Sequence, residues 1–157
     1  MTGAMKPQFF EDLFERDSRV IALHSADVEA ALANFRLVCR SSGRSMYHWS
    51  EHLGMVSLKA ADINVPGARK LVDALRYVYQ SMHYGAYIFT HFERQMRPAA
   101  LNMLGRIVEL EEPRTVVLLG ERVSLPPRLS ERVDHVVDTP HAEAEMLPRL
   151  RDGRWVV

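Results

Sequence analysis

Seven histidines are the residues of this chain most able to bind a metal ion or to move protons. Two of them, His48 and His52, are four residues apart, a spacing that would place both on one face of a helix. The stretch Ser45–Trp49 is rich in aromatic residues and predicts a strand instead, and no glutamate follows His48 as the helical zinc motif requires. We therefore expect one strand histidine, one loop histidine and no metal site.

Nucleophilic chemistry has little support in the sequence. Ser124, His135 and Asp138 can be arranged on paper as a nucleophile, a base and an orienting acid, but no G-x-S-x-G elbow surrounds the serine. The single cysteine, Cys39, excludes an intramolecular disulfide and a cysteine-based zinc site. It lies on the apolar side of a predicted helix, so we expect a buried side chain. No catalytic residue is predicted.

The charge and hydropathy of the chain argue against two classes of partner, nucleic acid and membrane. The chain has 20 basic and 20 acidic residues, so its formal net charge is zero. Proteins that neutralise many phosphates carry a basic surplus, and we therefore expect nucleic acid not to be a partner. No apolar run approaches the roughly 18 residues of a membrane-spanning helix, and no N-terminal signal pattern is present. We expect a cytoplasmic protein without membrane contact.

Apolar runs that alternate with helical patterns indicate the fold class. The runs that predict strands are Arg19–His24, Ser45–Trp49, Ala86–Phe92, Thr115–Leu119 and Val133–Val137. Leu53–Leu58 predicts a short strand or an irregular edge, within the poorly readable stretch 50–66. Near-continuous apolar strands are typical of sheets that are buried on both sides. We predict a three-layer α/β fold with a mostly parallel sheet of about five strands and helices on both faces.

Helical periodicity separates a short lead-in from one domain. Residues 1–17 predict a lead-in with a short amphipathic helix, Gln8–Asp17, and residues 18–157 a single α/β domain. The further predicted helices are Val28–Arg40, Gly67–His83, one that starts at Arg97–Pro98, a short polar one after Pro127, and Ala142–Arg151.

Aromatic residues offer two candidate interaction surfaces. Phe9, Phe10 and Phe14 form a stripe on the first predicted helix. Docking of this stripe on its own domain is the favoured interpretation, with partner binding as the alternative. Tyr77 and Tyr84 would mark a contact patch if they are exposed together.

The segment 125–144, LPPRLSERVDHVVDTPHAEA, resembles the end of the nucleotide-binding core of AAA-type ATPases. In that core a strand is followed by a loop, by a short helix before an arginine and an aspartate, and by a last strand that ends in proline. Here the matching residues are Arg132, Asp134 and Val136–Pro140. The segment is similar, more narrowly, to the degenerate domain that precedes the ATPase module in a family of bacterial and plastid AAA proteins. The resemblance implies a topology like that of P-loop NTPases.

The resemblance also implies a phosphate loop, G-x-x-x-x-G-K-[ST], after the first strand. Its backbone amides wrap the phosphates, its lysine neutralises charge and its hydroxyl holds magnesium. The corresponding stretch His24–Glu29 has no glycine and no lysine, and Asp27 and Glu29 would repel a triphosphate at the helix N-terminus. If a nucleotide binds nevertheless, the residues expected around it are Ser25, Ala26, Asp27, Glu93 and Arg132.

The rest of an ATPase site is incomplete too. After Ala86–Phe92, Glu93 could mimic one of the two required acids, but the aspartate that holds the metal is missing. Gly120-Glu121 takes the place of a polar sensor. Arg132 lies near the expected position of an arginine finger, which acts on a neighbour's nucleotide. We expect no hydrolysis and no cofactor.

Three functions are consistent with these observations. The first is a non-catalytic module with a P-loop-like scaffold that binds another protein, either an AAA ATPase or further copies of itself. The second is a nucleotide-binding domain for ATP or ADP with an unorthodox loop at His24–Val28. The third is a nucleic-acid accessory subunit, which the zero net charge opposes.

Overall fold

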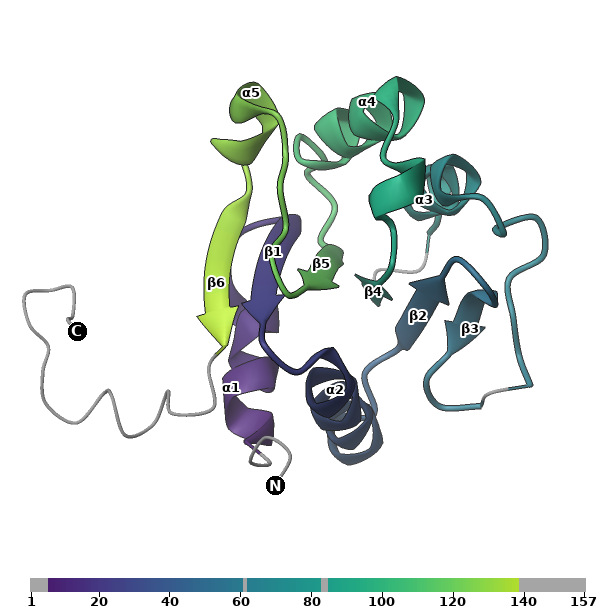
Figure 1. Cartoon of the computed structure of the whole chain (residues 1–157). Helices are drawn as coiled ribbons and strands as arrows, with labels where there is room; N and C mark the ends of the chain where they lie inside the picture. Colours follow the sequence, from purple (N-terminus) through teal and green to yellow (C-terminus); the bar gives the residue numbers. More distant parts are fainter. Residues whose placement is uncertain (1–5, 61, 83–84, 139–157) are drawn as a thin grey trace, which may run out of the picture.

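A six-stranded sheet with the order β3-β2-β4-β5-β1-β6 forms the centre of the molecule. The computed structural model describes residues 6–60, 62–82 and 85–138 (Figure 1). The strands are β1 (Val20–Ser25), β2 (Met46–Ser50), β3 (Gly54–Ser57), β4 (Ala86–Phe89), β5 (Thr115–Gly120) and β6 (Asp134–Asp138). All neighbouring strands pair in parallel except β3, which returns antiparallel to β2 at one edge.

Helices cover both faces of the sheet and make a three-layer structure (Figure 1). One face carries α1 (Pro7–Asp12), with a 3-10 turn at Leu13–Glu15, and α2 (Val28–Ser42). The other carries α3 (Leu71–Gln80), α4 (Pro98–Ile107), which follows a 3-10 turn at Glu93–Gln95, and α5 (Pro127–Ser130). The predicted α/β class and the mostly parallel sheet are confirmed, with six strands in place of about five.

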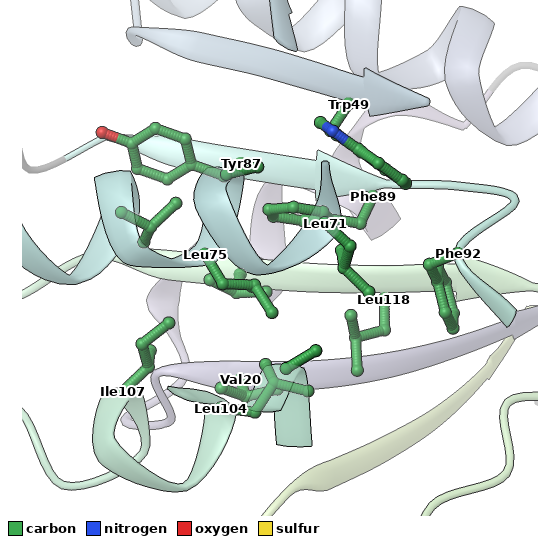
Figure 2. Close-up of a cluster of buried hydrophobic side chains, with 14 of the residues drawn as sticks. Val20, Trp49, Leu71, Leu75, Tyr87, Phe89, Phe92, Leu104, Ile107 and Leu118 are labelled. Carbon is green, nitrogen blue, oxygen red and sulfur yellow. The ribbon is translucent and has the colours of Figure 1, made fainter. Parts of the chain in front are cut away.

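Two hydrophobic cores result from the alternation of side chains along each strand. In β1, Val20 and Ala22 face α3 and α4, whereas Ile21 and Leu23 face α1 and α2, and all four are fully buried. Figure 2 shows the first core, where Leu71 and other α3 and α4 side chains pack on the aromatic residues of β2 and β4. Burial on both faces explains why these strands read as continuous apolar runs.

The first helix belongs to the second core. Phe10 is fully buried and meets Phe35 of α2 edge to face, with ring centroids 4.9 Å apart. Phe14 also contacts Phe35, and Phe9 packs against Phe10. The aromatic stripe therefore packs against its own domain, with Phe9 and Phe14 only partly buried.

Several element boundaries differ from those that the sequence predicts. The helix expected from Gly67 begins at Leu71, because Gly67 has a positive φ of 75° and the Ala68 carbonyl accepts a hydrogen bond from the Trp49 indole at 3.0 Å. The strand expected over Ala86–Phe92 ends at Phe89. Leu53–Leu58, ambiguous in sequence, contains the antiparallel strand β3. The predicted helix Ala142–Arg151 lies outside the described residues.

A buried arginine closes the C-terminal end of α3. Arg114 is 5% exposed, and its Nη1 donates to the carbonyls of Val78 at 2.7 Å and Ser81 at 2.9 Å. The last carbonyls of a helix have no intrahelical donor, so a cation placed there satisfies them and complements the helix dipole. This residue joins the link before β5 to the end of α3.

We expect Arg114→Met to lower the free energy of unfolding by about 2–4 kcal/mol, because the change removes the donor that Arg114 supplies to the carbonyls of Val78 and Ser81. The measurement is chemical denaturation followed by circular dichroism. Arg106→Met, at an exposed position of α4, is the control and should change stability by less than about 0.5 kcal/mol. Equal stability of the two variants would contradict the role assigned to Arg114.

Candidate functional site

A cleft of about 450 Å³ opens where β1, β4 and β5 end. Its walls come from the turn before α2, from the residues after β4 and from the residues after β5. The chain leaves β1 toward β2 on one side and leaves β5 toward β6 on the other, so the cleft lies at the point where the strand order reverses. In open α/β sheets this is the place where ligands bind. The cleft is therefore the position at which an ATPase of this topology would hold its nucleotide.

The turn that should hold phosphate is short and is filled by its own side chains. Only Ala26 and Asp27 separate the end of β1 from the first residue of α2. The Asp27 carboxylate accepts a hydrogen bond from the backbone N–H of Ala30 at 3.0 Å and so caps α2. The Asp27 N–H in turn donates to Ser25 Oγ at 3.3 Å. A donor that would face a phosphate in a P-loop is thus used within the turn.

A second set of contacts fixes Ser25 from the other side. Ser25 is 2% exposed, and its hydroxyl donates to Asp138 Oδ2 of β6 at 3.0 Å. The other oxygen of Asp138 forms an ion pair with Lys6 at 2.6 Å, with both side chains almost completely buried. The backbone N–H of Lys6 donates to Asn34 of α2 at 2.8 Å. These contacts tie β1, β6, α2 and the entry to α1 together beside the turn.

The charge of the cleft is unfavourable for a triphosphate. Four of the residues that line it are acidic, namely Asp27, Glu29, Glu93 and Glu121. The described residues that line it include no lysine or arginine. A nucleotide would therefore meet like charge at the helix end that attracts phosphate in active P-loop proteins.

The acid after β4 has no acidic partner at the end of that strand. Glu93 lines the cleft close to Gly120, but Thr90 and His91 precede it where a metal-holding aspartate would be needed. Thr90 is 1% exposed and forms a 2.8 Å hydrogen bond with His48 Nε2 of β2. Within the described residues, no group of three or more His, Cys, Asp or Glu side chains is arranged to hold a metal ion.

The structure brings together only part of the predicted nucleotide set. Ala26, Asp27 and Glu93 line the cleft, whereas the Ser25 hydroxyl is turned to Asp138. Arg132 precedes β6 and lies at the opposite end of the parallel strands, since Asp134 is in register with the start of β1. It pairs with Glu109 at 2.6 Å, and both side chains are well exposed.

The remaining predicted residues lie apart from the cleft. Tyr77 is partly buried and packs edge to face on Tyr87, and Tyr84 lies outside the described residues. The Ser124/His135/Asp138 triad does not form, because His135 bonds to other residues and Asp138 is held by Ser25 and Lys6.

A chain of hydrogen bonds through two histidines was missed by the sequence reasoning. The N–H of Val123 donates to His24 Nδ1 at 3.1 Å, and His24 Nε2 lies 3.1 Å from His135 Nδ1. His135 Nε2 lies 2.9 Å from the Ser130 hydroxyl. Because His24 Nδ1 accepts a bond, its proton is on Nε2 and points at His135, so both bonds require a neutral His24. The chain joins β1, β6, α5 and the β5–α5 loop.

Burial holds His24 in this neutral form. Burial lowers the pKa of His24 below its usual value of 6.5, and electrostatic interaction with His135 and Arg122 lowers it further. A proton added at Nδ1 would face the Val123 N–H, and two donors would then oppose each other.

A family model described as "SpoVK-like AAA ATPase, N-terminal domain" matches residues 7–138, from α1 to the end of β6. No curated protein gives a significant match. Within the described residues, no helix is long and apolar enough to cross a membrane.

Acidification should release the β5–α5 loop from β1. His24 contributes its stabilisation fully above pH 6.5 and loses it as the pH falls through its lowered pKa, because the unfolded chain binds the proton more readily. We expect the amide NMR signals of Val123 and Ser130 to shift together over this range. His24→Phe should abolish the shift, and His52→Phe in the β2–β3 turn should leave it unchanged. If the amide signal of Val123 shifts at a different pH from the His24 ring, the proposed chain of hydrogen bonds is contradicted.

His48 should make the fold acid-sensitive. Burial, followed by the charges of Arg36 and His91, lowers its pKa from 6.5 to about 4. The unfolded state therefore binds a proton that the folded state does not, and stability should fall by up to about 3 kcal/mol as the pH drops across this interval. His48→Gln keeps a hydrogen-bonding group near Thr90 and should lose most of that slope. Denaturation at a series of pH values tests this, and parallel profiles would disprove it.

Proposed function

The chain belongs to the family of SpoVK-like AAA ATPase N-terminal domains, and from this premise we propose that it is a non-catalytic module that binds another protein. The partner is an AAA ATPase or further copies of the chain itself. The observation that carries the proposal is the closed turn between β1 and α2, in which Asp27 and Ser25 take the place of a phosphate loop.

Geometry supports the loss of nucleotide binding. A P-loop needs several residues between its first strand and its helix so that successive amides can surround the phosphates. Two residues separate β1 from α2, and one of them caps the helix with its own carboxylate. A phosphate would have to displace this cap, which contributes about 1 kcal/mol to stability, and would receive no lysine in return.

The chemistry of hydrolysis lacks support as well. Phosphoryl transfer depends on a metal ion that bridges the phosphates, and on a residue that positions the attacking water. Glu93 is the only acidic residue in the stretch 90–95 that follows β4. Arg132 is paired with Glu109 at the opposite end of the strands. We therefore propose that the chain does not hydrolyse ATP and needs no cofactor.

A rigid platform that has lost its ligand is suited to protein contacts. The sheet is buried on both faces, so partner binding leaves the two cores intact and uses the surface. The zero net charge of the chain places no long-range repulsion in the way of association with its own copies. It also argues against a role on nucleic acid.

A nucleotide-binding role is the second candidate, and one observation favours it. The cleft of about 450 Å³ lies at the switch point of the sheet and is large enough for a small ligand. The four carboxylates that line it are the main argument against this role.

Calorimetry with ATP and ADP in the presence of magnesium separates the two candidates. We expect neither heat of binding nor a shift of the melting temperature at millimolar ligand. Under the same conditions, analytical ultracentrifugation should show self-association or a complex with the ATPase module of a SpoVK-like protein. Saturable nucleotide binding would contradict the proposal, and so would a monomer that forms no complex. A gel shift at low salt tests the nucleic-acid role.

A further inference from the structure

The outer side of β6 is open in the described part of the chain. β6 pairs with β1 over five residues along one side. No backbone hydrogen bond from the described residues reaches its other side. An edge of this kind presents backbone N–H and C=O groups at the spacing of a strand, so the chemistry that fits it is an extended chain.

The opposite edge of the sheet, formed by β3, is covered by the protein's own backbone. There the segment after β3 folds back on the strand, where the Ser57 N–H donates to the Ile63 carbonyl at 2.9 Å and the Val65 N–H donates to the Met55 carbonyl at 3.0 Å. Asn64 forms a bridge with Val56. The fold thus covers one edge with its own backbone, whereas the described residues leave the other open.

Side chains on β6 give its open edge little protection. The strand contains no lysine or proline, which commonly prevent edge pairing, and of its two aspartates Asp138 is buried in an ion pair with Lys6. Val137 is 62% exposed although it lies within the stretch of β6 that pairs with β1. On the other face, Asp134 is 38% exposed in its side chain and makes only a long contact of 3.4 Å with Arg16.

Charge indicates what kind of chain fits this edge. A second copy related by a two-fold axis, with all five residues of β6 paired antiparallel, would set Asp134 opposite Asp138. Lys6 already balances the charge of Asp138, so this pairing gives the half-exposed Asp134 carboxylate no basic partner. A different strand with a basic residue beside Asp134 would instead gain from the half-exposed carboxylate.

We propose that the outer edge of β6 is the docking site for an extended segment of a partner protein, which adds a strand to the sheet with an apolar residue beside Val137 and a basic residue beside Asp134. This inference rests on the proposed interaction function and names the surface that serves it. The strand β6 is fixed in position, because Asp138 contacts Ser25 and Lys6 and because His135 is hydrogen-bonded to His24.

A synthetic peptide of alternating β-branched residues tests the site on the full chain. The probe is a nine-residue peptide that carries valine and, three positions later, lysine, labelled for fluorescence anisotropy. We expect saturable binding, with amide NMR shifts that centre on residues 134–138. A peptide with the same side chains but N-methylated alternate amides should not bind, since it cannot donate along the edge. A peptide with glutamate in place of lysine should bind more weakly.

Matched variants locate the binding. Val137→Lys should weaken the peptide about fivefold or more, whereas Leu53→Lys, at a similarly exposed apolar residue of the β2–β3 turn, should leave it unchanged. Unchanged melting temperatures establish that both variants fold. Absence of binding at millimolar peptide, equal binding of the methylated peptide, or equal affinity of Val137→Lys would each overturn the proposal. If Val137→Lys still forms the complex seen by ultracentrifugation, the interaction function stands and only this surface is wrong.

Discussion

The hydrogen bonds around Asp27 and Ser25 determine what the rest of the fold can do. A helix N-terminus that follows a buried parallel strand is a natural anion site, because its first amides have no partner in the helix. Here the carboxylate of the capping residue satisfies one of these amides, and Asp138 and Lys6 fix the neighbouring serine from behind. The Lys6–Asp138 pair is buried, so loss of either partner would leave an uncompensated charge in the interior. The turn is therefore stable in its closed form.

The residues around the turn do not provide the charge that a bound phosphate requires. A nucleotide site must keep a positive potential around the phosphates. The cleft at the ends of β1, β4 and β5 instead collects four carboxylates without a lysine or arginine among the described residues that line it. The two cores, by contrast, are filled with large apolar side chains on both faces of the sheet (Figure 2). The packing of the sheet thus does not depend on the residues that line the cleft, because packing and ligand binding depend on different residues.

Much of the fold could be predicted from the sequence, because a strand buried on both faces is an apolar run whatever its neighbours are. The parts that could not be predicted depend on contacts between distant residues. The start of α3 is set by Gln95, whose side chain accepts from the Leu71 N–H at 2.7 Å, and by the bond from Trp49 to Ala68. Local periodicity carries no trace of either contact.

The candidate site, too, could be predicted from the sequence only where its features are local. The absence of glycine and lysine after β1 could be recognised in the sequence, and so could the acidic residues Asp27 and Glu29 in the same stretch. The histidine chain could not, because His24 and His135 are 111 residues apart and meet only when His135 pairs beside Ala22 in the register of β1 and β6.

The position of β6 follows from this network. One face of the strand holds Asp138, which reaches Ser25 and Lys6, and the other holds His135, which reaches His24 and Ser130. Both sets of contacts use side chains, and the pairing with β1 uses the backbone on one side only. The strand is thus fixed in place without any use of its outer backbone groups by the described residues. A fixed strand loses little conformational entropy when another chain pairs with it, so ordering costs fall mainly on the incoming segment. The contacts that close the turn between β1 and α2 therefore also fix the sheet edge at β6, which makes this edge suitable for recognition.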